Sequence, residues 1–205
     1  NACGGCKLQH ARDDFVATWK QDGVRAALDS HGLETHLRPI HTSPARSRRR
    51  ATFAAKRTKK GAMAGFYGRA SDVIVEISEC HLLHPALMKG LDVARELALL
   101  GASRKAALAV TVTVCETGLD VAVRNGKPLD GPLRMSLANA CQSLALTRLA
   151  WDDDVIAMES PPAQTFGQAT VVPPPGSFLQ ATLDGECALL NAVKESVIGS
   201  LRIAD

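Results

Sequence analysis

Two consecutive stretches of alternating apolar and polar residues restrict the fold of this chain more than any other feature. The stretch "AALAVTVTVCE" covers residues 106–116, and "GLDVAVRNG" covers residues 118–126. A period of two is typical of β-strands, and the short connection at Thr117–Gly118 predicts a tight turn between them. The middle of the chain is therefore expected to hold an antiparallel pair of strands.

Similar short runs occur on both sides of this pair, and segments with helical spacing separate them. Further strands are predicted within residues 49–58, 61–69, 72–78, 146–151, 154–160 and 168–175. Helices are predicted within residues 10–31, 85–101, 130–144 and 184–200, and a loop within 33–45. This succession predicts an α+β fold with a mainly antiparallel β-sheet and packed helices.

The composition is that of an ordinary soluble protein, with 46% hydrophobic and 22% charged residues. No apolar run approaches the ~18–20 residues of a membrane span, so no membrane partner is expected. We also expect a cytoplasmic location, and no protein partner is evident. The final "LRIAD" resembles the first strand of a doubly wound nucleotide-binding domain. We therefore expect that this chain is a piece cut from a longer protein.

The formal charge of +3 is unevenly distributed along the chain. Residues 46–60, "RSRRRATFAAKRTKK", contain no acidic side chain. Such a block is often only a solvated hairpin, but it also suits a polyanionic partner such as RNA. Phe53, Phe66 and Tyr67 could stack on unpaired bases, although Phe53 and Phe66 fit the core at least as well.

The N-terminal "CGGC" places Cys3 and Cys6 at a spacing typical of metal sites and redox dithiols. A thioredoxin-like dithiol needs a strand before the pair, which only two residues cannot supply. Zinc or an iron–sulfur cluster could both use this pair together with Cys80, and one more cysteine or a histidine such as His81 or His84 could complete a zinc site. We predict that the remaining cysteines, Cys115, Cys141 and Cys187, are buried and inert.

Three segments together resemble a known enzyme family. They are "CGGCKLQHA", "SRRRATFAAKRTKKGAMAGFYGRASDVIVEISECHLLHPAL" and "PPGSFLQAT". These segments resemble the class I S-adenosylmethionine-dependent RNA (uracil-5-)-methyltransferases, most closely the iron–sulfur branch that acts on 23S ribosomal RNA. The resemblance covers essentially the whole chain in order.

The resemblance implies specific roles for several residues. Cys3, Cys6 and Cys80 would be three ligands of a 4Fe–4S cluster, whose fourth cysteine lies upstream in the family. Gln180 would contact S-adenosylmethionine. RNA contacts would centre on Arg48–Arg50. The complete set of predicted RNA-binding residues is Arg48, Arg49, Arg50, Lys56, Arg57, Lys59 and Lys60.

The resemblance also implies a domain organisation and a reaction. Residues 1–172 would form a central RNA-binding and iron–sulfur domain, and residues 173–205 would lead into a Rossmann-like methyltransferase domain, truncated after its first strand. The family moves a methyl group to C5 of a uridine, using a cysteine in a Ser-Cys-Asn-Pro motif that these residues lack. We therefore expect this piece to be inactive alone. The alternatives are a non-catalytic metal-dependent RNA-binding module and, less favoured, a thiol oxidoreductase.

Overall fold

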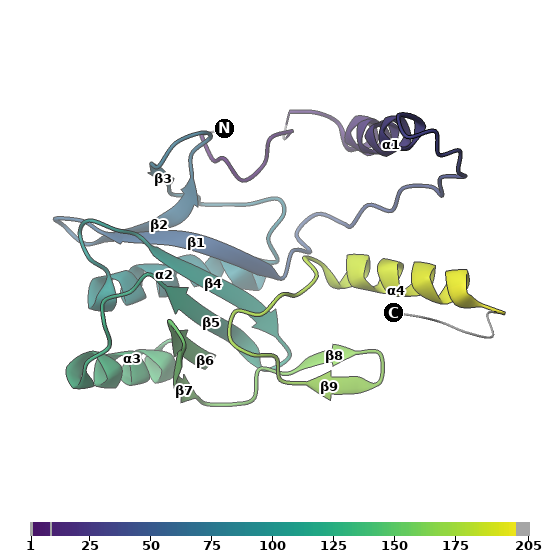
Figure 1. Ribbon diagram of the computed structural model, residues 1–205. Coiled ribbons are helices and arrows are strands. Elements are labelled where there is room, and N and C mark those ends of the chain that lie inside the picture. The colour runs from purple at the N-terminus through teal and green to yellow at the C-terminus, as the bar shows by residue number, and fades with distance from the viewer. Residues whose placement is uncertain (1, 9, 200–205) are drawn as a thin grey trace. The chain divides into compact units, whose positions relative to one another are not determined.

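A computed structural model describes residues 2–8 and 10–199 of the chain (Figure 1). The chain divides into two compact units, which are described separately. The first unit comprises Asn1–Gly5 and Ala45–Leu183, and the second comprises Cys6–Pro44 and Asp184–Asp205. The predicted final strand at residues 201–205 lies outside the described residues.

The first unit is built on a seven-stranded sheet of order β3-β2-β1-β4-β5-β6-β7. All neighbouring strands are antiparallel except β5 and β6. This arrangement confirms the predicted α+β class with mainly antiparallel pairing. The strands are β1 (Arg50–Arg57), β2 (Ala62–Tyr67), β3 (Ile74–Val75), β4 (Leu108–Cys115), β5 (Gly118–Arg124), β6 (Leu146–Trp151) and β7 (Asp154–Met158).

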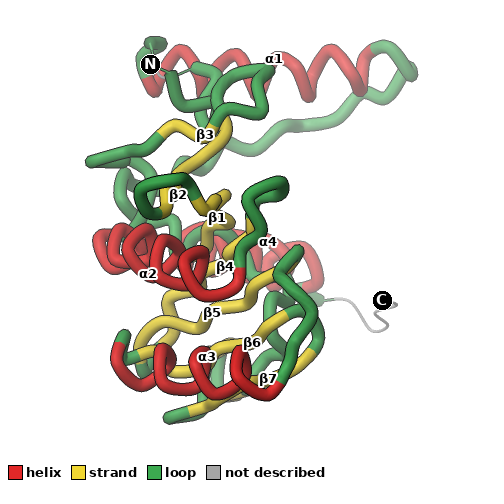
Figure 2. Tube along the Cα trace, turned by 90° about the vertical axis from the view of Figure 1, so that its left-hand side faces the viewer, coloured by secondary structure: helices red, strands yellow, loops and turns green. Residues whose placement is uncertain are grey.

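Two helices cover one face of this sheet, α2 (Pro85–Gly101) and α3 (Gly131–Ser143). They pack against each other, α2 also on β1 and β2 and α3 on β6 and β7 (Figure 2). Each helix starts with a side-chain cap: the His84 imidazole accepts a bond from the Ala86 amide, and the Asp130 carboxylate accepts one from the Leu133 amide. Because parallel strands need a crossover, α3 explains how β5 and β6 come to run side by side.

The two faces of the sheet differ in chemistry, because side chains alternate along each strand. Phe53, Val110 and Val123 are fully buried and stand in one row across β1, β4 and β5, on the face covered by the helices. The next row lies on the other face and contains Thr52 and Thr111, whose hydroxyls are 2.9 Å apart. This second face therefore carries small and polar side chains.

A small second sheet pairs β8 (Gln164–Phe166) with β9 (Ala169–Val171). The sequence pattern predicted β9 but not β8. It also predicted a longer strand at residues 72–78, of which only Ile74–Val75 pairs with β2. Neighbouring Val73 is 66% exposed. The other residues of the predicted strand do not pair with a neighbouring strand. The reason is that β3 is the edge strand of the sheet and has β2 as its single neighbour.

The second unit contains two helices, α1 (Asp13–Asp29) and most of α4 (Leu183–Val197). Both match predicted helices. Polar contacts join its two chain segments: the Arg38 guanidinium lies 2.7 Å from the Glu195 carboxylate, and His41 Nε2 lies 2.7 Å from that of Asp184. The His41 and Ser43 hydrogen bonds hold the pKa of Asp184 below its usual value. No helix among the described residues is long and apolar enough to cross a membrane.

Trp151, at the end of β6, is the largest fully buried side chain of the first unit. Its indole N–H donates to the Lys127 carbonyl at 3.0 Å. The ring lies directly against two glycines: a Cβ added at Gly101 would be 2.3 Å from it, and one added at Gly126 would be 2.2 Å from it. Only glycine allows the backbone to approach the indole this closely.

We predict that Gly126→Ala lowers the free energy of unfolding by about 1–3 kcal/mol, because the added methyl group forces Trp151 or the backbone to move. Urea unfolding followed by tryptophan fluorescence would measure the change. Gly131→Ala is the matched control, since an added Cβ there meets no atom within 4 Å. Equal stability of the two variants would contradict this account of Trp151 packing.

Candidate functional site

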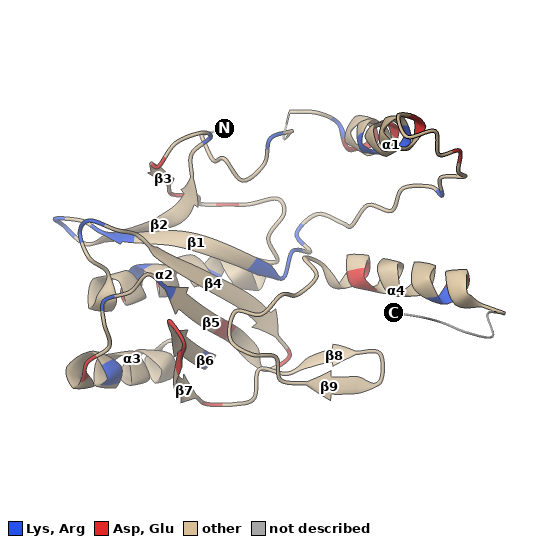
Figure 3. Ribbon diagram, in the orientation of Figure 1, with Lys and Arg blue, Asp and Glu red and all other residues tan. Residues whose placement is uncertain are grey.

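The basic block of the sequence is divided by β1 into two clusters at opposite ends of the strand. Arg48–Arg50 lie at its start, and Lys56–Lys60 lie at its end and in the following turn. Because a strand rises about 3.3 Å per residue, Arg50 and Arg57 are roughly 23 Å apart. The ribbon is accordingly blue, the colour of Lys and Arg, at both ends of β1 in Figure 3. A single basic stretch in the sequence therefore supplies two separate sites.

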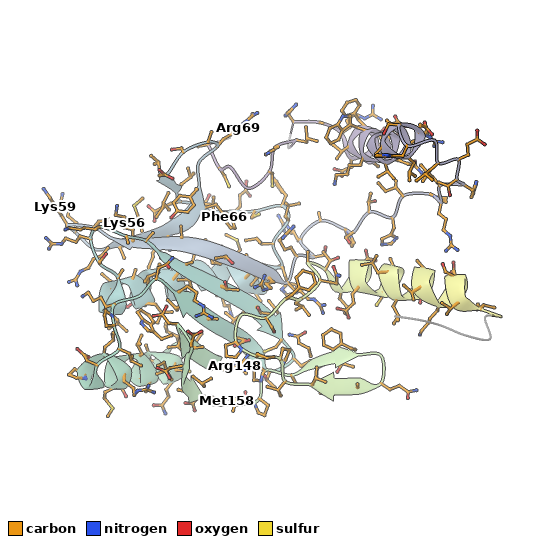
Figure 4. The ribbon with its side chains drawn as sticks, viewed as in Figure 1. Lys56, Lys59, Phe66, Arg69, Arg148 and Met158 are labelled. Carbon is orange, nitrogen blue, oxygen red and sulfur yellow. The ribbon has the colours of Figure 1, made fainter. Side chains whose placement is uncertain are left out.

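The first site is the turn between β1 and β2, which holds Lys59 (Figure 4) and Lys60. Both side chains are exposed. Residues 103–107 lie beside it, because Ala55 of β1 pairs with Leu108 at the start of β4. This neighbour brings in two further exposed cations, Arg104 and Lys105. We call these six residues the hairpin-end cluster: Lys56, Arg57, Lys59, Lys60, Arg104 and Lys105.

No member of the hairpin-end cluster forms an ion pair with any residue in the described part of the chain. Other arginines of the same unit do: Arg95 pairs with Glu76, Arg124 with Asp153, and Arg134 with Asp154. Uncompensated cations gathered on one loop region attract phosphate groups without regard to base sequence. The sequence pattern missed Arg104 and Lys105, which only strand pairing places there.

At the other end of β1, the guanidinium groups of Arg49 and Arg50 bind protein carbonyls. Arg49 Nε donates to the Gln180 carbonyl at 3.2 Å, and the Arg49 amide donates to the Ala181 carbonyl at 2.8 Å. Arg50 Nη2 donates to the Gly176 carbonyl at 2.9 Å. Arg48 is exposed, while its amide bonds to the Leu82 carbonyl. Direct RNA contact by these three arginines stays a prediction.

The carbonyls that Arg49 and Arg50 bind belong to residues 173–181, which we call the Phe178 segment. It begins in a turn where Gly176 has φ of 68°, a conformation that favours glycine. Leu179 is buried and anchors the segment, whereas Phe178 is 78% exposed and Gln180 is half-buried. Exposure therefore falls from Phe178 to Leu179, and the ring of Phe178 faces solvent. A small cavity of about 10 Å³ lies under the segment.

The three predicted metal ligands belong to two different units of the structure. Cys3 forms an isolated antiparallel bridge with Gly68, and the Gly4 amide donates to the Tyr67 carbonyl at 2.9 Å. This pairing holds the N-terminus of the first unit beside β2. Cys80 is half-buried in that unit, and Cys6 belongs to the second. Among the described residues, no three His, Cys, Asp or Glu side chains are grouped so that they could hold a metal ion.

The predicted burial is confirmed for Cys115 and Cys141 and is wrong for Cys187, which is exposed; that the two buried thiols are inert stays a prediction. The reason is that α4 buries none of its residues, so its apolar spacing does not correspond to a packed face. Burial raises the pKa of the Cys141 thiol to about 11, and the negative charge of Glu159 adds to this effect. Cys141 therefore stays protonated at neutral pH.

No family model matches the chain, but individual proteins do. It is 34% identical over 203 residues to an uncharacterized RNA methyltransferase of Brucella suis, a match that covers 99% of this chain and 49% of the relative. An uncharacterized RNA methyltransferase of Caulobacter vibrioides is 35% identical over 210 residues, covering 99% of this chain and 51% of the relative. The chain is similar to RNA methyltransferases along nearly all of its length. It spans about half the length of these relatives.

The fold has a solved counterpart as well. The crystal structure of the Pyrococcus abyssi tRNA (uracil-54, C5)-methyltransferase in complex with S-adenosyl-L-homocysteine matches with a TM-score of 0.65 and 19% sequence identity. The match covers 95% of this chain and 50% of that one. At this identity the likeness establishes a shared fold, which agrees with the predicted α+β architecture.

We predict that a neutral maleimide at pH 7 modifies Cys187 in the folded chain and leaves Cys115 and Cys141 unmodified. With a pKa of about 11, only roughly one Cys141 thiol in 10,000 is ionised at that pH, and burial blocks access as well. Peptide mass spectrometry with and without denaturant would identify the labelled positions. Labelling of Cys141 in the folded chain at the rate of Cys187 would contradict the assignment.

Proposed function

We propose that this chain is part of an enzyme that transfers a methyl group from S-adenosylmethionine to C5 of a uridine in RNA. The observation that supports this most directly is the similarity to RNA methyltransferases over 99% of the chain. The uracil-C5 reaction is supported by the fold shared with the Pyrococcus abyssi enzyme, which acts on uracil 54 of tRNA. Residues 1–172 serve RNA binding, and residues 173–205 lead into the methyltransferase domain.

RNA binding is the contribution that this chain's charges support best. The hairpin-end cluster offers six cations without an acidic partner among the described residues, including the predicted Lys56, Arg57, Lys59 and Lys60. Lys and Arg bind the phosphate backbone, and this term supplies most of the affinity for RNA while leaving sequence choice to other contacts. The cluster therefore holds the transcript, and the target base is selected elsewhere.

The Phe178 segment is the part of this chain that we assign to the methyl-donor side. The side-chain amide of Gln180 can hydrogen-bond a polar ligand without adding charge, and the exposed ring of Phe178 can lie against a flat base. S-adenosylmethionine supplies the methyl group when it is bound. Because the family's cysteine nucleophile is outside this sequence, the chain alone positions the reactants and does not carry out the transfer.

We further propose that the substrate is 23S ribosomal RNA and that the enzyme works in the cytoplasm. The support for the ribosomal substrate is the cysteine pattern, which resembles the iron–sulfur branch. Since the neighbour in the solved structures is named for tRNA, methylation of tRNA instead is the competing outcome.

We also retain a 4Fe–4S cluster held by Cys3, Cys6 and Cys80 as a proposal. Soft thiolates suit such clusters, and Cys3 is already held beside β2 in the same unit as Cys80. Among the described residues no three such side chains are grouped as a ligand set, so this proposal depends on the cysteine pattern. No step of the reaction depends on the cluster in this account.

The methylation proposal predicts turnover by the full-length protein and none by residues 1–205. The assay uses tritiated S-adenosylmethionine with 23S rRNA, tRNA and a uridine-free RNA, followed by nucleoside analysis for 5-methyluridine. Product on tRNA alone would support the proposed methylation reaction but would contradict 23S rRNA as its substrate. RNA binding by the full-length protein without any methyl transfer would favour the non-catalytic RNA-binding module instead.

The cluster proposal predicts about four iron and four acid-labile sulfide per full-length protein purified without oxygen. Cys80→Ser should lower both values, because it removes a thiolate ligand. Cys187→Ser is the matched control and should leave them unchanged, since Cys187 is exposed on α4 and is not a proposed ligand. Stoichiometric zinc without sulfide would show that the protein holds zinc instead of an iron–sulfur cluster.

A further inference from the structure

A row of polar side chains crosses the sheet on the face that the helices leave free. The strand register places Arg50 of β1 opposite Thr113 of β4, Thr113 opposite Asp120 of β5, and Asp120 opposite Arg148 of β6. Directly paired residues point to the same face, so these four side chains form one line across four strands. Neighbouring strands are about 4.8 Å apart, so Arg50 and Arg148 are separated by roughly 14 Å.

The centre of this row is a buried ion pair. Arg148 Nε and Nη2 donate to the two carboxylate oxygens of Asp120 at 2.9 and 2.8 Å, and both side chains are about nine-tenths buried or more. This two-point contact keeps the guanidinium in one orientation. The same Nη2 also donates to the Pro173 carbonyl at 2.9 Å. The ion pair therefore directs Arg148 toward the Phe178 segment.

The Phe178 segment follows this row from one arginine to the other. Its Pro173 carbonyl is bound by Arg148, and its Gly176 carbonyl is bound by Arg50. A Cβ on Gly176 would be 3.4 Å from Ala122, and the small cavity between segment and sheet is lined by Thr113 and Asp120. The three-residue step from Pro173 to Gly176 covers at most about 10 Å, and the long arginine side chains span the rest.

We propose that Arg50 and Arg148 are positioning residues that fix the Phe178 segment, so that Phe178 and Gln180 are presented in one arrangement to the methyl donor and the target base. This inference rests on the proposed methyltransferase function. It gives Arg50 a different role from the RNA contact that the sequence predicted. The RNA contact and the positioning role then belong to opposite ends of β1.

Two observations separate this role from ordinary packing. The segment has few bonds of its own, such as that from the Ser177 amide to the Pro174 carbonyl at 3.2 Å, so side chains of the sheet determine where it lies. In addition, Arg50 Nε is buried without a hydrogen-bond partner among the described residues. Burying an unsatisfied donor opposes folding, so stability alone would not favour arginine at this position.

The test compares two variants of the full-length protein with opposite expected effects. Arg50→Met removes the bond to Gly176, and we expect kcat for methyl transfer at saturating RNA to fall about 10- to 100-fold, because small misplacement of reacting groups is costly. The RNA Kd should change less than about twofold. Arg50→Lys should recover part of the rate, because one donor can still reach the carbonyl.

The matched variant is Lys59→Ala combined with Lys60→Ala at the hairpin-end cluster. Here the RNA Kd should rise about tenfold and the salt dependence of binding should become shallower. If Arg50→Met instead weakens RNA binding with kcat intact, Arg50 is an RNA ligand and the positioning role is rejected. Arg148 is left intact because its truncation would leave Asp120 buried without a partner.

Hydrogen exchange provides a readout that does not depend on the reaction. In Arg50→Met, the amides of residues 177–181 should exchange at least about tenfold faster, while those of β4 and β5 stay protected. Unchanged exchange in the segment would overturn the proposal even if the enzyme is active. Absence of methyl transfer by the wild-type protein, with faster exchange in the variant, would reject the proposed function and retain the positioning contact.

Discussion

The register of β1 against β4 is the constraint on which the rest of this structure depends. The pairs from Arg50↔Thr113 to Ala55↔Leu108 fix which side chains of β1 face the helices and which face the free side of the sheet. Phe53 enters the core under α2, whereas Arg50 joins the polar row. A slip by one residue would exchange these two sets, burying charge and exposing the aromatic ring, so the register is strongly specified.

The same register separates two tasks that are continuous in the sequence. One end of β1 carries cations without acidic partners among the described residues, which suits attraction of an RNA backbone. The other end carries arginines bonded to the carbonyls of the Phe178 segment. In the proposed enzyme, RNA affinity and the placement of Phe178 and Gln180 can therefore vary independently. A strand of eight residues is long enough to keep the two ends apart.

Pattern and local chemistry predicted most elements of the fold. Period-two alternation identified β4 and β5, and the helix beginning at Pro85 followed from its proline and its apolar spacing. The short strand β8 was missed because it shows no apolar alternation: its buried residue is Gln164, whose side-chain amide donates to the Val114 carbonyl at 3.0 Å. Cys187 was placed wrongly because helical periodicity shows an apolar stripe but not whether anything covers it.

The sequence by itself determined the fold class, the boundaries of the main helices and the presence of a concentrated basic stretch, because each depends on residues that are neighbours in the chain. Only the tertiary structure decided that this stretch divides into two sites, that Arg104 and Lys105 join one of them, and that Asp120 and Arg148 form a buried pair directed at Pro173. These depend on which strands lie side by side. Such pairings join residues far apart in the sequence, so no local pattern specifies them.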